Sequence, residues 1–176
     1  MKNYLVITAL GSDRPGIVDE LSKYISDQEC NIEDSRMSVL GGEFAIMLLV
    51  SGNWNTVAKL ESQMPGLQEK LDMTIVAKST EPRQRPGKAL PYVADVISID
   101  HPGIVNNLAN FFSTRKINIE ELTTSNYAAA HTGTPMFSVH IEVGIPADIQ
   151  IADLRESFMD FCDNLNLDAV LEPLKS

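Results

Sequence analysis

One 21-residue segment occurs twice in this chain of 176 residues. DRPGIVDELSKYISDQECNIE begins at Asp13 and DHPGIVNNLANFFSTRKINIE begins at Asp100, and without a gap the copies agree at 10 of their 21 positions. Unrelated segments of ordinary composition would agree at about one or two positions. A repeat of this length indicates that one structural unit is present twice. We therefore expect two domains, residues 1–78 and 91–176.

The first copy lies within a pattern of four strands and two helices. In order, we expect a strand over 4–10, a helix from Asp13 to about residue 28, strands over 31–40 and 43–50, a helix from Trp54, and a strand over 71–77. Asp13 is expected near the N-cap of the first helix, with Pro15 in the first turn, where its missing N–H costs nothing. The glycines at 41–42 predict a tight hairpin turn. Pro and Gly at 65–66 are expected to break the end of the second helix.

The second half repeats this order. Four apolar positions of the first helix recur after a shift of 87 positions, at Ile104, Leu108, Phe111 and Phe112. We expect a strand over 93–99, a second helix that turns Leu154, Phe158, Phe161 and Leu165 inward, and a closing strand over 167–171. The order predicts an α+β fold class, with two ferredoxin-like βαββαβ domains, antiparallel sheets, and helices on one face of each sheet.

The two halves differ in their hairpins. Phe44 matches Phe137 after a shift of 93 positions, so the second hairpin contains six extra residues, in or near 128–135. A longer loop at this place indicates that the halves need not do the same work.

Between the halves lies the stretch STEPRQRPGKALP, which contains three prolines, one glycine and three basic residues. This composition disfavours both a helix and a central strand. We interpret residues 79–90 as a linker.

Charge and composition exclude several classes of function. The formal net charge is −10, whereas nucleic-acid binding needs a basic face, so we expect no direct contact with nucleic acid. No apolar run approaches about 18 residues and no signal peptide is recognisable, which predicts a cytoplasmic protein without membrane contact. Cys30 and Cys162 are expected to act as small apolar side chains. The three histidines lack metal-ligand spacing and no catalytic motif is present, so we expect no metal, no cofactor and no enzyme activity.

The repeated segment also suggests a binding site. Pro15 and Gly16 leave the first-turn amides of the helix uncovered, and such a terminus attracts a carboxylate. Gly103 repeats the arrangement. An asparagine at the start of the next strand, Asn31 or Asn118, offers a donor and an acceptor, and the backbone beside it can receive an ammonium group. Together these groups could hold a free amino acid, although the same residues also serve as a plain helix start and turn without any ligand.

These motifs resemble the ACT domain, a regulatory module. The resemblance rests on DRPGI followed by Cys-Asn-Ile within a βαββαβ unit, and on the second copy of that motif. It implies amino-acid binding at domain interfaces, through the first strand-to-helix corner and the start of the second strand. The candidate contacts that it implies are Asp13, Gly16, Asn31 and Ile32 in the first half, and Asp100, Gly103, Asn118 and Ile119 in the second.

Two such domains without a catalytic domain resemble the family's accessory transcriptional regulators. This resemblance implies a protein that binds no DNA itself, that binds the DNA-binding activator of the glycine cleavage operon, and that responds to glycine or another small amino acid as its effector. We also expect a homo-oligomer, because exposed edge strands can pair. Two alternatives remain open: a detached regulatory subunit of an amino-acid metabolic enzyme, and a dimerisation module without a ligand.

Overall fold

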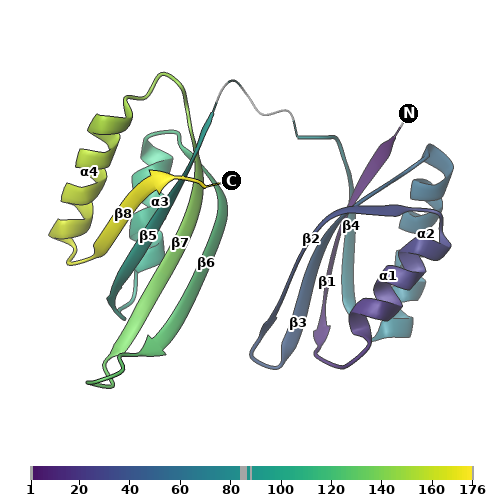
Figure 1. The fold of residues 1–176 in the computed structure, drawn as a ribbon. Coiled ribbons are helices and arrows are strands. Elements are labelled where there is room, and N and C mark those ends of the chain that lie inside the picture. Colours follow the sequence, from purple (N-terminus) through teal and green to yellow (C-terminus); the bar gives the residue numbers. More distant parts are fainter. Residues whose placement is uncertain (1, 84–86, 88, 176) are drawn as a thin grey trace. The chain divides into compact units, whose positions relative to one another are not determined.

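The computed structural model describes residues 2–83, 87 and 89–175. The chain divides into two compact units, Met1–Arg83 and Gln84–Ser176 (Figure 1). The first unit contains β1 (Asn3–Ser12), α1 (Ile17–Asp27), β2 (Asn31–Leu40), β3 (Glu43–Gly52), α2 (Trp54–Leu71) and β4 (Thr74–Thr80). The second contains β5 (Leu90–Ile99), α3 (Ile104–Thr114), β6 (Asn118–Ala128), β7 (Pro135–Ile145), α4 (Ile151–Asn164) and β8 (Asp168–Pro173).

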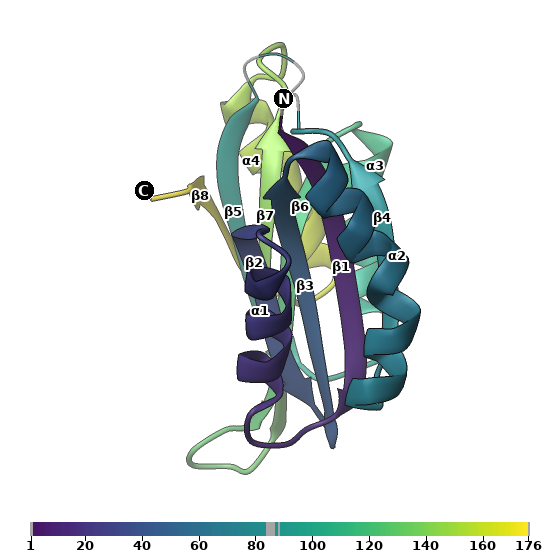
Figure 2. The ribbon, with the colours of Figure 1, turned by 90° about the vertical axis from the view of Figure 1, so that its right-hand side faces the viewer.

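Each unit has one four-stranded antiparallel sheet. The strand orders are β2-β3-β1-β4 and β6-β7-β5-β8, so the two units share one topology. Helices α1 and α2 lie side by side on one face of the first sheet (Figure 2). In the second unit, α3 and α4 contribute to a single core cluster with their sheet. The predicted α+β fold class, with two ferredoxin-like βαββαβ units, is confirmed.

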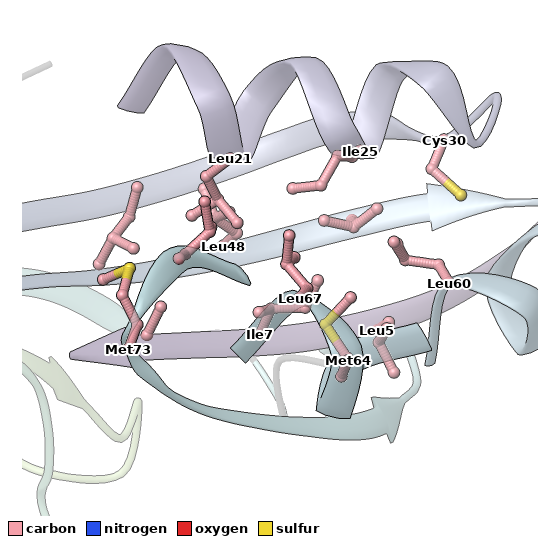
Figure 3. Packing of buried hydrophobic residues seen from close by; sticks show 14 of the residues in the cluster. Leu5, Ile7, Leu21, Ile25, Cys30, Leu48, Leu60, Met64, Leu67 and Met73 are labelled. Atoms are coloured by element: carbon pink, nitrogen blue, oxygen red, sulfur yellow. The ribbon is translucent and has the colours of Figure 1, made fainter. Parts of the chain in front are cut away.

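The first core lies between the sheet and its two helices. Alternate residues of β1 are fully buried, because successive side chains of a strand point to opposite faces. Leu21 and Ile25 of α1 meet Leu60 and Leu67 of α2 over the strands (Figure 3). The spacing of three or four residues along each helix builds one apolar face.

The second core is more aromatic than the first. Phe111, Phe112 and Phe158 pack with ring centroids 5.2 to 5.5 Å apart. Both cysteines are free and buried in the core of their own unit, as expected from the sequence. Burial raises the pKa of the Cys162 thiol to about 12.

The helix starts differ from the prediction. Helix α1 begins at Ile17 with Gly16 as its N-cap, so Asp13 and Pro15 precede the helix instead of forming its first turn. Gly16 has a φ of 89°, a left-handed conformation that a right-handed helix cannot include. Gly103 adopts the same conformation before α3, with a φ of 96°.

The predicted break at residues 65–66 was wrong. Helix α2 continues through Pro65 to Leu71. Its buried face includes Met64 and Leu67, and their packing outweighs the hydrogen bond that a proline removes. Asp72 then ends the helix in a left-handed conformation, so the closing strand begins at Thr74 and not at Leu71.

The two hairpins differ as predicted. Leu40 pairs with Glu43 across a two-residue turn, whereas Tyr127 pairs with Met136 across eight residues. The first of those eight continues β6 and the last begins β7, which leaves a six-residue loop at 129–134.

The proposed linker, residues 79–90, includes residues 84–86 and 88, which lie outside the described residues. At its ends, β4 extends to Thr80 and β5 begins at Leu90. Across the parts of the chain that the structure describes, no helix is long and apolar enough to cross a membrane.

Candidate functional site

Each unit has a strand-to-helix corner, at residues 13–16 in the first unit and at 100–103 in the second. We call these the first corner and the second corner. Their glycines, Gly16 and Gly103, are N-caps of 11-residue helices, and neither helix has a side-chain cap. The backbone amides of an uncapped first turn, together with the helix dipole, favour a negative charge at such a place.

The first corner already contains a carboxylate of its own. Arg14 donates two hydrogen bonds to Glu20, with nitrogen–oxygen distances of 2.7 and 3.0 Å. Glu20 belongs to the first turn of α1, and its Oε1 lies 3.8 Å from the point that a Cβ on Gly16 would occupy. The hydrogen bonds lower the pKa of Glu20 and raise the pKa of Arg14. The Glu20 carboxylate, paired with Arg14, therefore lies beside the N-cap of α1.

The second corner lacks that carboxylate. At the shift of 87 positions that relates the repeats, His101 stands in place of Arg14 and Asn107 in place of Glu20. Helix α3 accordingly has no acidic residue in its first turn. The two corners therefore share a backbone but differ in charge.

The second corner is also open. No atom lies within 4 Å of the point that a Cβ on Gly103 would occupy. A hollow of about 490 Å³ adjoins the glycine. Its lining comprises His101, Gly103, Ile104, Val105, Asn106, Ala109 and Phe137. His101 is oriented by its Nδ1, which lies 3.1 Å from the carbonyl oxygen of Pro102.

The ends of the hairpin strands β6 and β7 are joined to this second corner. The backbone N–H of Asp100 donates to the carbonyl oxygen of Pro135 at 3.0 Å. The Asp100 carboxylate accepts a hydrogen bond from the side-chain amide of Asn126, also at 3.0 Å. Asp100 therefore holds the hairpin against the corner, which is a structural role that the sequence did not reveal.

The candidate asparagines do not lie near the corners of their own units. Asn31 begins β2 at the end of the sheet where β1 also begins, whereas Gly16 follows the other end of β1. Helix α1 lies between them, and 11 residues span about 16 Å. Asn118 and Gly103 are separated by α3 in the same way. One unit therefore does not bring its two groups of candidate contacts together.

The glutamate that ends each repeat occupies a β-bulge. The register between β2 and β3 shifts across Glu33, and the register between β6 and β7 shifts across Glu120. The preceding residues, Ile32 and Ile119, are half-buried and pack against the two cores. The side chains of these isoleucines therefore contribute to folding, and only their backbone is available to a ligand.

Glu33 also engages Asn31. The Glu33 carboxylate accepts hydrogen bonds from Ser51, from Lys2 at 2.9 Å, and from the Asn31 side-chain amide at 3.5 Å. These bonds, with that from Ser51 the strongest cause, lower the pKa of Glu33 to about 2. Sequence reasoning missed this cluster, although the glutamate shared by both repeats was its visible signal.

Comparison with known proteins agrees with these features. Residues 3–78 match the model of the ACT domain. The chain is 36% identical over 165 residues to the glycine cleavage system transcriptional repressor of Escherichia coli (strain K12), which covers 94% of this chain and 87% of that protein. A solved structure of a candidate glycine cleavage system transcriptional repressor has a TM-score of 0.74 at 29% identity and covers 100% of this chain and 99% of its own. A protein of unknown identity from Galdieria sulphuraria has a TM-score of 0.79 at 27% identity and covers 99% of this chain and 100% of its own.

Proposed function

The chain belongs to the ACT-domain family, in the tandem form of the glycine cleavage system transcriptional repressor. We propose that it represses glycine cleavage genes by binding their DNA-binding activator. We propose further that glycine is its effector. Membership of this family makes it a regulatory protein and not an enzyme. The observation that carries the effector proposal is the contrast between the two corners.

The effector carboxylate binds at the second corner. There the amides of α3 face a hollow, and no acidic side chain of the first turn competes for them. At the first corner the Glu20 carboxylate already lies beside Gly16 and is held there by Arg14, so an external carboxylate would have to displace it.

The effector's ammonium group needs a partner from elsewhere. Because Asn118 lies at the far end of α3, one ligand can contact a corner and a strand start only if these come from two different domains. We propose that a homo-oligomer supplies the second set of contacts. Every residue of β2 except Ile32 is exposed, and β2 forms one edge of its sheet, which supports pairing between chains.

Calorimetric titration with glycine, with serine and alanine as comparisons, tests the effector proposal. Asn107→Glu places a carboxylate where Glu20 stands in the first unit, and we expect it to weaken glycine binding at least about tenfold. Asn110→Glu adds the same charge further along α3, on an exposed side chain, and should bind glycine like the wild type. A substitution at Gly103 would be less informative, because its left-handed backbone would be strained by any side chain.

Two results would contradict the effector proposal. If Asn107→Glu binds glycine as the wild type does, the ligand does not use the second corner. If none of the three amino acids binds to the assembled protein, the chain is a dimerisation module and not a sensor. The remaining alternative is a regulatory subunit of a metabolic enzyme. Purification of the chain with its bound partner distinguishes it from the proposed function, because such a subunit would retain an enzyme and not an activator.

A further inference from the structure

The second sheet has one face that no helix covers. Helices α3 and α4 pack on the face that contains Ala94, Val96 and Ile141. The opposite face, which we call the acidic face, contains five carboxylates. They are Asp95 on β5, Glu121 on β6, Glu142 on β7, and Asp168 and Glu172 on β8. Residues that pair directly across neighbouring strands project from the same face of a sheet. Asp95 pairs with His140, Ile97 with Asp168, and Glu121 with Glu142, so the five carboxylates share one face.

Carboxylates outnumber basic side chains on the acidic face. Across the four described strands, the outward positions include no lysine or arginine. His140 is the only basic side chain there among the described residues, and two carboxylates hold it. Its Nδ1 lies 2.6 Å from Asp95, and its Nε2 lies 3.8 Å from Glu142. Among the described outward side chains of these strands, five are carboxylates and one, His140, is basic.

Exposed apolar side chains lie among these carboxylates. Ile97 is 43% exposed, Ile99 62% and Val170 45%. All three belong to β5 and β8, the strands that also provide Asp95 and Asp168. Exposed apolar side chains next to charged ones are typical of a surface that binds another protein.

The fold itself does not require this charge. The corresponding face of the first sheet has the same topology but contains two acidic residues, Asp34 and Glu43, and two basic residues, Arg36 and Lys78. The excess of carboxylates on the acidic face is therefore a property of the second unit's surface and not of the shared topology, and it suits a partner of opposite charge.

We propose that the acidic face binds the activator through a lysine- and arginine-rich surface of that protein. This inference rests on the proposed function, because it takes the partner to be a DNA-binding protein. Such proteins carry clustered basic residues to neutralise phosphates. The basic side chains would meet the carboxylates, and the apolar parts of the partner would cover Ile97, Ile99 and Val170.

The test measures association of the full chain with the purified activator by fluorescence anisotropy, at about 50 and about 300 mM salt. The acidic-face variant combines Asp95→Asn, Glu121→Gln and Glu142→Gln. The matched control combines Asp153→Asn, Glu156→Gln and Asp160→Asn, which remove the same charge from exposed positions on α4. We expect the acidic-face variant to bind at least about tenfold more weakly, with a smaller salt dependence, and the control to bind within about twofold of the wild type.

Different failures point to different errors. If the wild type binds the activator and the acidic-face variant binds equally well, the acidic face is not the docking surface, and the proposed function stands. If the wild type does not bind the activator, the proposed function and this inference both fall. If the variant instead changes the sedimentation of the chain alone, with activator binding unchanged, the face joins copies of this chain and the inference is overturned. Circular dichroism and thermal unfolding establish that both variants are folded.

Discussion

The glutamate shared by the two repeats shows how one residue type serves two local structures. In the first unit, Glu33 turns from its bulge toward Ser51 and Lys2. In the second unit Gly144 faces the bulge in place of a serine, and the carboxylate of Glu120 lies over it, 3.0 Å from the point that a Cβ would occupy. The bulge is common to both units, but Gly144 offers Glu120 no hydroxyl like the one that Ser51 donates to Glu33.

The Ser51 hydroxyl is predicted to hold the pKa of Glu33 down. A carboxylate with a lowered pKa in the folded state stabilises the fold above its usual pKa of 4.5, and that stability is lost as the pH falls toward 2. Ser51→Ala should raise the pKa of Glu33 toward 4.5 and reduce the loss of stability across this range. A carboxyl titration by NMR measures the pKa, and urea unfolding at several pH values measures the stability. An unchanged Glu33 titration in Ser51→Ala, with Ser38→Ala as control, would contradict the assignment.

His140 is predicted to stabilise the second unit in its protonated form. Asp95 on β5 raises the pKa of His140 above 6.5, mainly through their hydrogen bond, and Glu142 on β7, the strand of His140 itself, adds to the effect. On the other side, β6 presents Thr123 opposite the ring and Glu121 diagonally. Since the pKa is raised, this stabilisation is present below pH 6.5 and is lost as the pH rises through the folded-state pKa.

Asp95→Asn should lower the pKa of His140, which an NMR titration of the imidazole signals measures directly. His101 and His131 provide internal references in the same spectrum, since the substitution is distant from both in the sheet. A His140 titration that is the same with and without Asp95 would show that the hydrogen bond does not control the charge.

The repeated motif located both corners in the sequence, because a glycine after proline is a strong signal for a special backbone conformation. The difference between the corners was also visible, as Arg14 and Glu20 against His101 and Asn107. The structure was needed to show that Arg14 and Glu20, six positions apart, meet in an ion pair beside the left-handed Gly16. The structure adds that the corner and the asparagine of one unit lie at opposite ends of the helix between them.

Among the elements, strand positions were predicted more closely than helix ends. The expected strand over 31–40 coincides with β2, because its ends are marked by the helix before it and the glycine turn after it. The ends of the helices depend on backbone conformation and packing, which the spacing of apolar residues does not reveal. Tertiary packing lets α2 continue through Pro65. The left-handed conformations of Gly16 and Gly103 make α1 and α3 begin one residue after these glycines.

Helix α2 is predicted to gain stability from a residue other than glycine at 66. Gly66→Ala should stabilise the first unit by about 1 kcal/mol, because alanine has the higher helix propensity and nothing lies within 4 Å of its Cβ position. Gly41→Ala is the matched control. It also meets no atom within 4 Å, but its φ of 64° disfavours a side chain, so it should destabilise by about 1 kcal/mol. Urea unfolding of both variants checks the pair, and destabilisation by Gly66→Ala would show that α2 is not a regular helix there.

At the scale of the whole molecule, duplication has produced two units with one topology and different surfaces. The first unit has an internal ion pair at its corner and a sheet face of balanced charge. The second has an open corner with a hollow beside it, an enlarged hairpin, and the acidic face. The proposed division of work assigns effector binding and activator binding to the second unit. Linkage then requires that glycine and the activator each weaken the binding of the other by the same factor.

The most direct measurement is the dissociation constant between this chain and the activator, determined by fluorescence anisotropy with and without saturating glycine. We predict that the wild type binds the activator and that glycine weakens this binding. The Asn107→Glu variant should bind the activator with an affinity that glycine no longer changes. If the wild type binds the activator equally well with and without glycine, while calorimetry shows that glycine is bound, glycine is not the effector of this regulator.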